Sequence, residues 1–155
     1  MTSDHPTILV SYDGSEASRA AFAPAARIAA LMNASIVLVR VHHAPPEVWA
    51  HPEKEHRERE LTRLKTQWQQ DIEAAGAALA KEHGIEVKAE ARLLGERWNI
   101  PGELLHAADE HDAVMICMAT HGETGIRRLF VGSVTQEVIS ESKRPVTLIR
   151  AGREA

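Results

Sequence analysis

Apolar residues are arranged along the chain in short continuous runs that alternate with longer stretches of helical spacing. Runs that are apolar or β-branched throughout are typical of strands buried in a parallel sheet. They are Thr7 to Tyr12, Ser35 to Val41 and Ala113 to Met118, and Val146 to Arg150 is a similar run near the C-terminus. The pattern predicts a strand at each of these four places.

Ile85 to Leu93 has a different pattern, because apolar and charged residues alternate in it. The charged positions are Glu86, Lys88, Glu90 and Arg92. Side chains of a strand alternate between its two faces, so one face of this strand is expected to meet water. A strand with one wet face is expected at the edge of the sheet.

Between the predicted strands, apolar residues recur at spacings of three and four, which is the period of a helix with one apolar face. Gly84 is placed to end the longest helix, and Pro101 stands at a first-turn position that tolerates proline. His42 to Pro52 is expected to be a loop because it contains three prolines. The predicted helices span about 16–33, 53–83, 99–110 and 132–142.

Strands and helices alternate along the chain, which predicts an α/β fold with one open, five-stranded parallel sheet and helices on both faces. A wet third strand fits the strand order 3-2-1-4-5. In that order the winding changes direction between the first and fourth strands, and ligands of open α/β sheets bind at the carboxyl ends of such strands. Asp13 to Ser15 is expected to face Ala119 to Gly122 there.

The chain of 155 residues has the length of one domain, taken as residues 1–155. Its net charge of -4 argues against a nucleic-acid partner, which would need a basic face. Cys117 is the one cysteine and lies in an apolar run, which fits a reducing compartment. The sequence shows neither a leader-peptide pattern nor the ~20 apolar residues of a membrane span, so a cytoplasmic protein without membrane insertion is expected.

The sequence contains nine histidines, but their spacing matches no closed zinc pattern and they have no cysteine partners. No Ser-His-Asp or paired-carboxylate arrangement can be assigned, and no Walker lysine follows Gly132. We therefore predict no metal held by protein ligands alone, no catalytic residue and no dedicated catalytic activity.

A glycine-bearing segment joins the fourth predicted strand to the last helix, which begins near Gly132 and Ser133. A helix start offers unpaired backbone N–H groups and the positive end of the helix dipole, and glycine lets an anion approach closely. Ser133 either contacts such an anion or forms a capping box with Gln136. Asp13 is either a ligand-contacting residue or the N-cap of the first helix.

The chain resembles the universal stress protein family along nearly its whole length. The similarity includes the Asp-Gly-Ser that follows the first strand, Val41-His42 at the end of the second, Asp112 ahead of the fourth, and Arg-Pro-Val at the last. Nucleotide-binding members carry glycine, two residues, glycine, nine residues, then glycine and serine or threonine. Gly122, Gly132 and Ser133 fit this spacing, whereas Ala119 occupies the place of the first glycine.

The resemblance implies an adenine nucleotide alpha hydrolase-like, Rossmann-like fold with a site for ATP or another adenine nucleotide, whose phosphates carry Mg²⁺. Asp13 would lie near the ribose and phosphates, and the backbone of Val41 would meet the adenine edge. Ala119 would be harmless with a negative φ and would crowd the ribose otherwise. The implied phosphate-binding residues are Gly122, Gly132, Ser133 and Val134.

Three functions are compared. In the main hypothesis the chain is a stress-response nucleotide-binding module, in which ATP orders residues 122–131 and an unknown regulatory protein binds the ordered surface. The alternative is a nucleotide-free dimeric stress adaptor, which Ala119 favours, and a weaker alternative is a slow ATPase or autokinase. A homodimer is expected because Val146 to Arg150 would lie at a sheet edge with open hydrogen-bonding groups.

Overall fold

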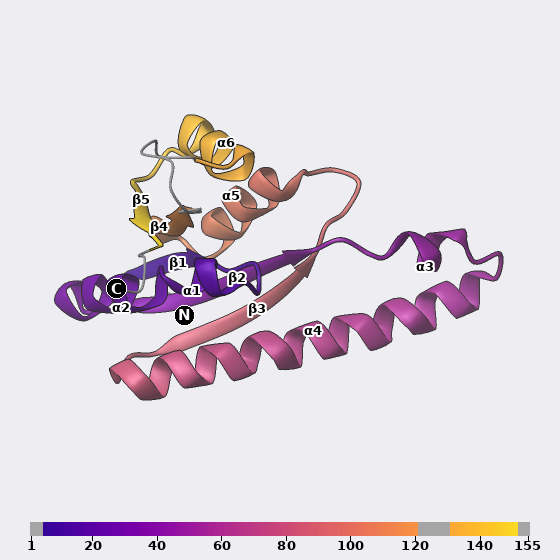
Figure 1. The fold of residues 1–155 in the computed structure, drawn as a ribbon, viewed down its shortest axis with the longest axis horizontal. Coiled ribbons are helices and arrows are strands. Elements are labelled where there is room, and N and C mark those ends of the chain that lie inside the picture. The colour runs from indigo at the N-terminus through magenta and orange to yellow at the C-terminus, as the bar shows by residue number, and fades with distance from the viewer. Residues whose placement is uncertain (1–4, 121–130, 152–155) are drawn as a thin grey trace.

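The computed structural model describes residues 5–120 and 131–151, and in it one sheet lies between two layers of helices (Figure 1). Its elements in chain order are β1 (Thr7–Ser11), α1 (Glu16–Arg19), α2 (Phe22–Met32), β2 (Ser35–His42), α3 (Pro46–Ala50), α4 (Lys54–His83), β3 (Val87–Leu93), α5 (Ile100–Glu110), β4 (Ala113–Thr120), α6 (Ser133–Glu141) and β5 (Val146–Arg150).

All four pairs of neighbouring strands are parallel, and the strands lie in the order β3-β2-β1-β4-β5. The predicted α/β class and strand order are confirmed. Because β1 and β4 are neighbours although they are far apart in sequence, the change of winding direction falls between them, and their carboxyl ends define the expected binding edge.

The central strands are buried because their side chains alternate between two cores. Ile8 and Val10 face the side covered by α2 and α4, whereas Leu9 faces the side covered by α5 and α6. All three side chains are fully buried. A strand covered on both faces needs apolar residues at every position, which explains its continuous apolar run.

The helix predicted over residues 16–33 is two helices, because the chain bends at Ala20 and Ala21. Ser15 caps α1 by accepting a hydrogen bond from the Ser18 N–H. In one continuous helix Pro24 would remove an internal hydrogen bond and clash with the preceding turn. Starting α2 at Phe22 places Pro24 in a first turn, where no such bond is required.

The expectation that His42 to Pro52 is entirely a loop is wrong, because it contains the short helix α3. Pro45 precedes this helix with an extended backbone, and Pro46 occupies the first helical position, which proline favours. Val48 is buried, while 58% of Trp49 is exposed.

β3 lies at the sheet edge as predicted, but its charged face does not simply meet water. Arg92 donates hydrogen bonds to Glu103 (2.7 Å) and Glu110 (2.6 Å) of α5 and is also paired with Glu90. Only 12% of the Arg92 side chain is exposed. The alternation identified the residues on this face, but it contains no information about the helix that packs on it.

α4 ends at Gly84, whose φ of 63° is the left-handed conformation of the predicted cap. The helix runs alongside β3 and extends beyond the sheet, and α3 lies beside its N-terminal end (Figure 1). None of the helices within residues 5–120 and 131–151 is both long and apolar enough to cross a membrane.

Candidate functional site

The turn after β1 carries the first predicted site residue, Asp13. Its Oδ1 accepts a hydrogen bond from the Ser15 N–H at 2.8 Å, and the N-cap of α1 is Ser15. The alternative in which Asp13 caps the first helix is therefore wrong. The Asp13 side chain is exposed at the carboxyl end of β1, where a ligand can reach it.

Gly14 and Arg40 meet directly at this turn. Gly14 has a φ of 90°, and a Cβ built there would lie 2.6 Å from Arg40 Nη1. The Arg40 guanidinium also lies 5.9 Å from the centre of the Tyr12 ring. Arg40 was not among the predicted site residues, although a lone charge within an apolar run is a usable signal of a special environment.

The strand register brings Asp13, Val41 and the end of β4 to one edge of the sheet. Ser11 pairs with Val39 of β2, and Val10 pairs with Cys117 of β4. Two residues after Ser11, Val39 and Cys117, the chain reaches Asp13, Val41 and Ala119. These three residues lie at the carboxyl ends of the neighbouring strands β1, β2 and β4. The structure therefore brings these three predicted residues together.

Ala119 lies in a conformation that does not require glycine. It is part of β4 and pairs with Ile149 of β5. Asn33 and Asp112 are the non-glycine residues with positive φ in the described part of the chain, so φ of Ala119 is not positive. Its methyl group packs against the core beneath α2. The missing first glycine therefore introduces no backbone strain.

The start of α6 has no side-chain cap from any residue that the structure describes. Gly132 is the N-cap, and Gln136 donates its side-chain N–H to the Val131 carbonyl rather than completing a capping box. The capping-box alternative for Ser133 is therefore wrong. The first helical hydrogen bond runs from the Gln136 N–H to the Gly132 carbonyl (3.0 Å).

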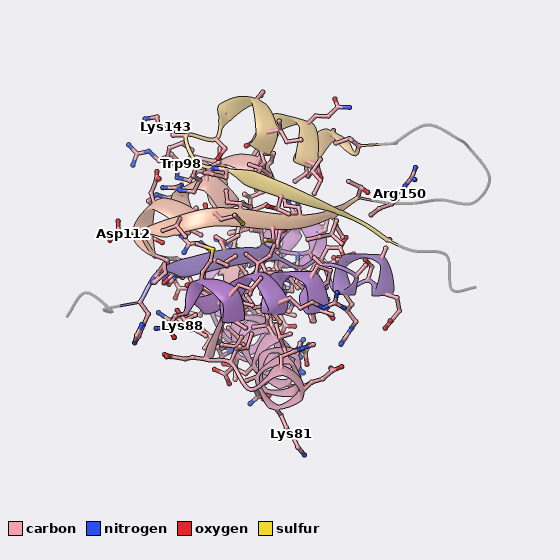
Figure 2. All side chains as sticks on the ribbon, turned by 90° about the vertical axis from the view of Figure 1, so that its left-hand side faces the viewer. Lys81, Lys88, Trp98, Asp112, Lys143 and Arg150 are labelled. Atoms are coloured by element: carbon pink, nitrogen blue, oxygen red, sulfur yellow. The ribbon has the colours of Figure 1, made fainter. Side chains whose placement is uncertain are left out.

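Three backbone N–H groups of α6 consequently have no acceptor among the described residues: those of Ser133, Val134 and Thr135. The Ser133 side chain is exposed, whereas Val134 packs against the second core, so Val134 can offer a ligand only its backbone. α6 begins on the side of the molecule where Arg150 ends β5 (Figure 2), which is the side of the carboxyl ends. Gly122, the remaining predicted site residue, lies outside the described residues.

His42 is a buried titratable group beside this edge. Its ring stacks on Trp68 at 4.3 Å between centroids, and its Nε2 has no hydrogen-bond partner within the described ranges. Burial, together with the smaller effect of the nearby Arg40 charge, lowers the pKa of His42 to about 4, against an opposing effect of Asp71. His42 is therefore neutral at pH 7.

The described residues contain no group of three or more His, Cys, Asp or Glu side chains placed to hold a metal ion. Cys117 is fully buried, and burial raises the pKa of its thiol to about 11. A thiol with that pKa is a poor nucleophile at pH 7. The chemistry that this part of the structure supports is binding of an anionic ligand.

An open parallel sheet with helices on both faces defines a Rossmann-like protein. The polar turn after β1 and the start of α6 then form a candidate nucleotide site. Comparison with known sequences refines this class. The model of the universal stress protein family matches residues 5–150, and the chain belongs to that family.

Individual relatives agree with this assignment. The chain is 32% identical to a universal stress protein of Thermus aquaticus encoded 3′ of a QAH/OAS sulfhydrylase, over 93% of this chain and 98% of the relative. Its fold is similar to that of MJ0577 of Methanocaldococcus jannaschii, with a TM-score of 0.73, 23% identity, and coverage of 97% of this chain and 99% of that one. It is also similar to an Archaeoglobus fulgidus universal stress protein solved in complex with dAMP, with a TM-score of 0.62, 20% identity, and coverage of 96% and 99%.

Proposed function

We propose that this chain is a stress-response module that binds ATP or another adenine nucleotide where β4 leads into α6. The observation that carries the proposal is the row of N–H groups at the start of α6 that lack acceptors among the described residues. Such a helix start is a site for phosphate. The dAMP bound by the Archaeoglobus fulgidus relative supports an adenine nucleotide as the ligand.

Four of the predicted residues have a stated role in this proposal. The N–H groups of Ser133 and Val134 bind the phosphates, assisted by the Ser133 hydroxyl and the helix dipole. Asp13 lies near the ribose and phosphates, and the Val41 backbone meets the adenine edge. Mg²⁺, held mainly by phosphate oxygens and water, neutralises part of the phosphate charge when the nucleotide is bound.

Thermal unfolding with and without ATP tests this proposal. At an ATP concentration about one hundred times Kd, binding stabilises the fold by about 2.7 kcal/mol, which raises Tm by roughly 5–10 °C for a chain of this size. Native mass spectrometry of protein purified without added nucleotide is expected to show a co-purified adenine nucleotide. Absence of both signals at millimolar ATP would contradict nucleotide binding and favour the nucleotide-free adaptor.

A glycine pair gives the matched variants. Among the described residues, a Cβ built at Gly132 meets no atom within 4 Å, and the same is true at Gly95 in the loop before α5. Both Gly132→Ala and Gly95→Ala are therefore expected to fold normally. The methyl group in Gly132→Ala obstructs the approach to the helix start and is expected to remove the ATP shift, whereas Gly95→Ala retains it.

The proposal includes a homodimer formed through β5, which lies at one edge of the sheet. The opposite edge strand, β3, is partly covered: Gln69 of α4 donates to the Ala89 carbonyl and accepts from the Ala91 N–H, both at 2.9 Å. An uncovered strand edge is a template for pairing with another chain. This difference between the two edges supports β5 as the pairing strand.

A further inference from the structure

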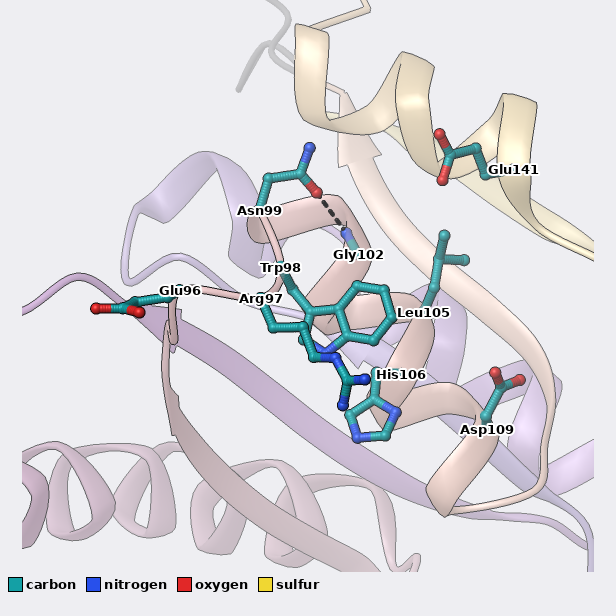
Figure 3. Close-up of a pocket in the computed structure, with 9 residues that line it drawn as sticks. All are labelled: Glu96, Arg97, Trp98, Asn99, Gly102, Leu105, His106, Asp109 and Glu141. Carbon is teal, nitrogen blue, oxygen red and sulfur yellow. Dashed lines mark hydrogen bonds between the residues drawn. The ribbon is translucent and has the colours of Figure 1, made fainter.

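A groove lies on the outer side of α5 and α6, away from the residues assigned to the nucleotide (Figure 3). Its volume is about 520 Å³, within the range of sites that bind small ligands or single side chains. We call it the indole groove and define it by five of its lining residues: Trp98, Leu105, His106, Asp109 and Glu141.

Trp98 is held in an exposed position by the local structure. The indole stacks on His106 at 5.8 Å between centroids, yet 43% of the residue remains exposed. A Cβ built at Gly102 would lie 3.2 Å from Trp98 Cε3, so the glycine gives the indole room to lie on α5. Asn99 fixes the end of the loop, because its Oδ1 accepts from the Gly102 N–H at 2.9 Å. The aromatic face is thus preorganised for contact.

The charges around the indole favour a cation. The guanidinium of Arg97, which also lines the groove, lies 5.9 Å from the centre of the Trp98 ring, so a partner's basic side chain would replace a cation that the ring already contacts. Asp109 is paired with Arg144 at 2.7 Å, but Glu141 has no cationic partner among the described residues. Figure 3 shows Glu141 on α6 across Leu105 from the indole. A carboxylate and an aromatic face therefore border the same space.

We propose that the indole groove binds a basic segment of a partner protein, with one lysine or arginine side chain over Trp98 and paired with Glu141. α6 begins at the proposed phosphate site and ends at Glu141, and Asn99 donates to Glu137 of α6 at 2.7 Å. The groove thus supplies a surface for the regulatory partner. Its regulatory role rests on the proposed nucleotide function, whereas binding of the basic segment does not.

The test is a titration of the whole protein with two peptides, followed by the indole N–H signals in ¹H–¹⁵N NMR spectra. The basic probe is acetyl-ARLKA-amide, and the matched acidic probe is acetyl-AELDA-amide. The basic peptide is expected to shift the Trp98 signal saturably and the acidic peptide is not. The signal is assigned by its loss in Trp98→Phe.

Variants distinguish binding of the basic peptide in the indole groove from its non-specific electrostatic attraction to the protein. Trp98→Ala is expected to weaken the basic peptide about tenfold through loss of the cation–π contact. Glu141→Gln, on an exposed residue, is expected to weaken it about threefold. Trp49→Ala removes another exposed indole, on α3, and is expected to leave the affinity unchanged.

Equal binding of both peptides, absence of a saturable shift at millimolar peptide, or parent-like affinity in both Trp98→Ala and Glu141→Gln would overturn the proposal. The titration is run without ATP and repeated with it. Binding without ATP supports the groove whether or not nucleotide binds, so failure of the nucleotide proposal is detected separately, by the absence of an ATP melting shift.

Discussion

His42 shows how one buried side chain links stability to pH. Its folded-state pKa of about 4 lies below the ordinary histidine value of 6.5, because burial and the nearby Arg40 disfavour the charged ring. The unfolded chain therefore binds the proton more readily, and the free energy of unfolding falls as the pH falls from about 6.5 to about 4. Above about pH 6.5 the contribution of neutral His42 is fully present.

We predict that acid destabilises the parent more than His42→Gln. After allowance for partial solvent screening, the pKa difference corresponds to about 2 kcal/mol lost by the parent between about pH 7.5 and about pH 4.5. Urea unfolding at both pH values measures this loss. His43→Gln, at an exposed neighbouring histidine, is the control and should follow the parent. Equal losses in the parent and His42→Gln would show that His42 is not the titrating group.

The site residues that could be predicted from the sequence are those that lie where a helix begins or a strand ends. Gly132 and Ser133 were placed at a helix start, and Asp13 at the end of a strand, because helix and strand boundaries have local signals. The position of Arg40 against Gly14 depends on the pairing of β1 with β2. Such contacts between distant segments have no local pattern in the sequence.

At the scale of elements, Gln69 attaches α4 to the edge of the sheet. The Glu86 carbonyl and the Leu94 N–H bond to β2, so the alternate residues Ala89 and Ala91 direct their backbone groups outward. The amide of Gln69 pairs with two of these groups, the Ala89 carbonyl and the Ala91 N–H. A helix side chain thus acts as a partner for the edge strand.

We predict that Gln69→Leu lowers the free energy of unfolding by about 1–2 kcal/mol, because two backbone groups lose their partner. Amide hydrogen exchange at Ala91 is expected to become faster. Gln67→Leu is the matched control, since Gln67 bonds the exposed Asp71 on the same helix, and its effect should stay within about 0.5 kcal/mol. Unchanged exchange at Ala91 in Gln69→Leu would contradict the assignment.

Element boundaries were predictable where a single proline or glycine decides the local backbone. They were missed where the effect of a proline competes with the apolar spacing or with a favourable first-turn position. Gly84 ended α4 as expected. Pro24 required a new helix start, but the apolar spacing across it continues unbroken, so the two segments appeared as one helix. In α3 the favourable first-turn position of Pro46 outweighed the general effect of proline on helices.

At the scale of the whole molecule, the strand order followed from one observation, the alternating pattern of 85–93. That pattern placed β3 at an edge, and the handedness of crossovers then limited the remaining arrangements. The indole groove was not predicted, because it forms where a loop, α5 and α6 meet. Its residues share no spacing that would distinguish them from a solvated helix face.

The proposed homodimer gives a prediction about β5. Pro145 and Ala151 bond to β4, so Val146, Leu148 and Arg150 direct their N–H groups to the open edge. Arg150→Pro removes an outward N–H and is expected to weaken the dimer about tenfold in sedimentation measurements, with Tm nearly unchanged. Ile149→Pro removes an inward N–H and is expected to lower Tm. A parent chain that sediments as a monomer at micromolar concentration would contradict the dimer.

The Gln69 contact also limits how large an assembly can grow. A sheet with two uncovered borders can add copies at each side and polymerise into a ribbon, whereas here Gln69 of α4 pairs with two backbone groups of one border. Pairing through β5 would leave a Gln69-covered strand at both ends of the enlarged sheet. If the chain dimerises through β5, adding a third chain would require displacing the Gln69 contact, which disfavours growth of the sheet beyond two chains.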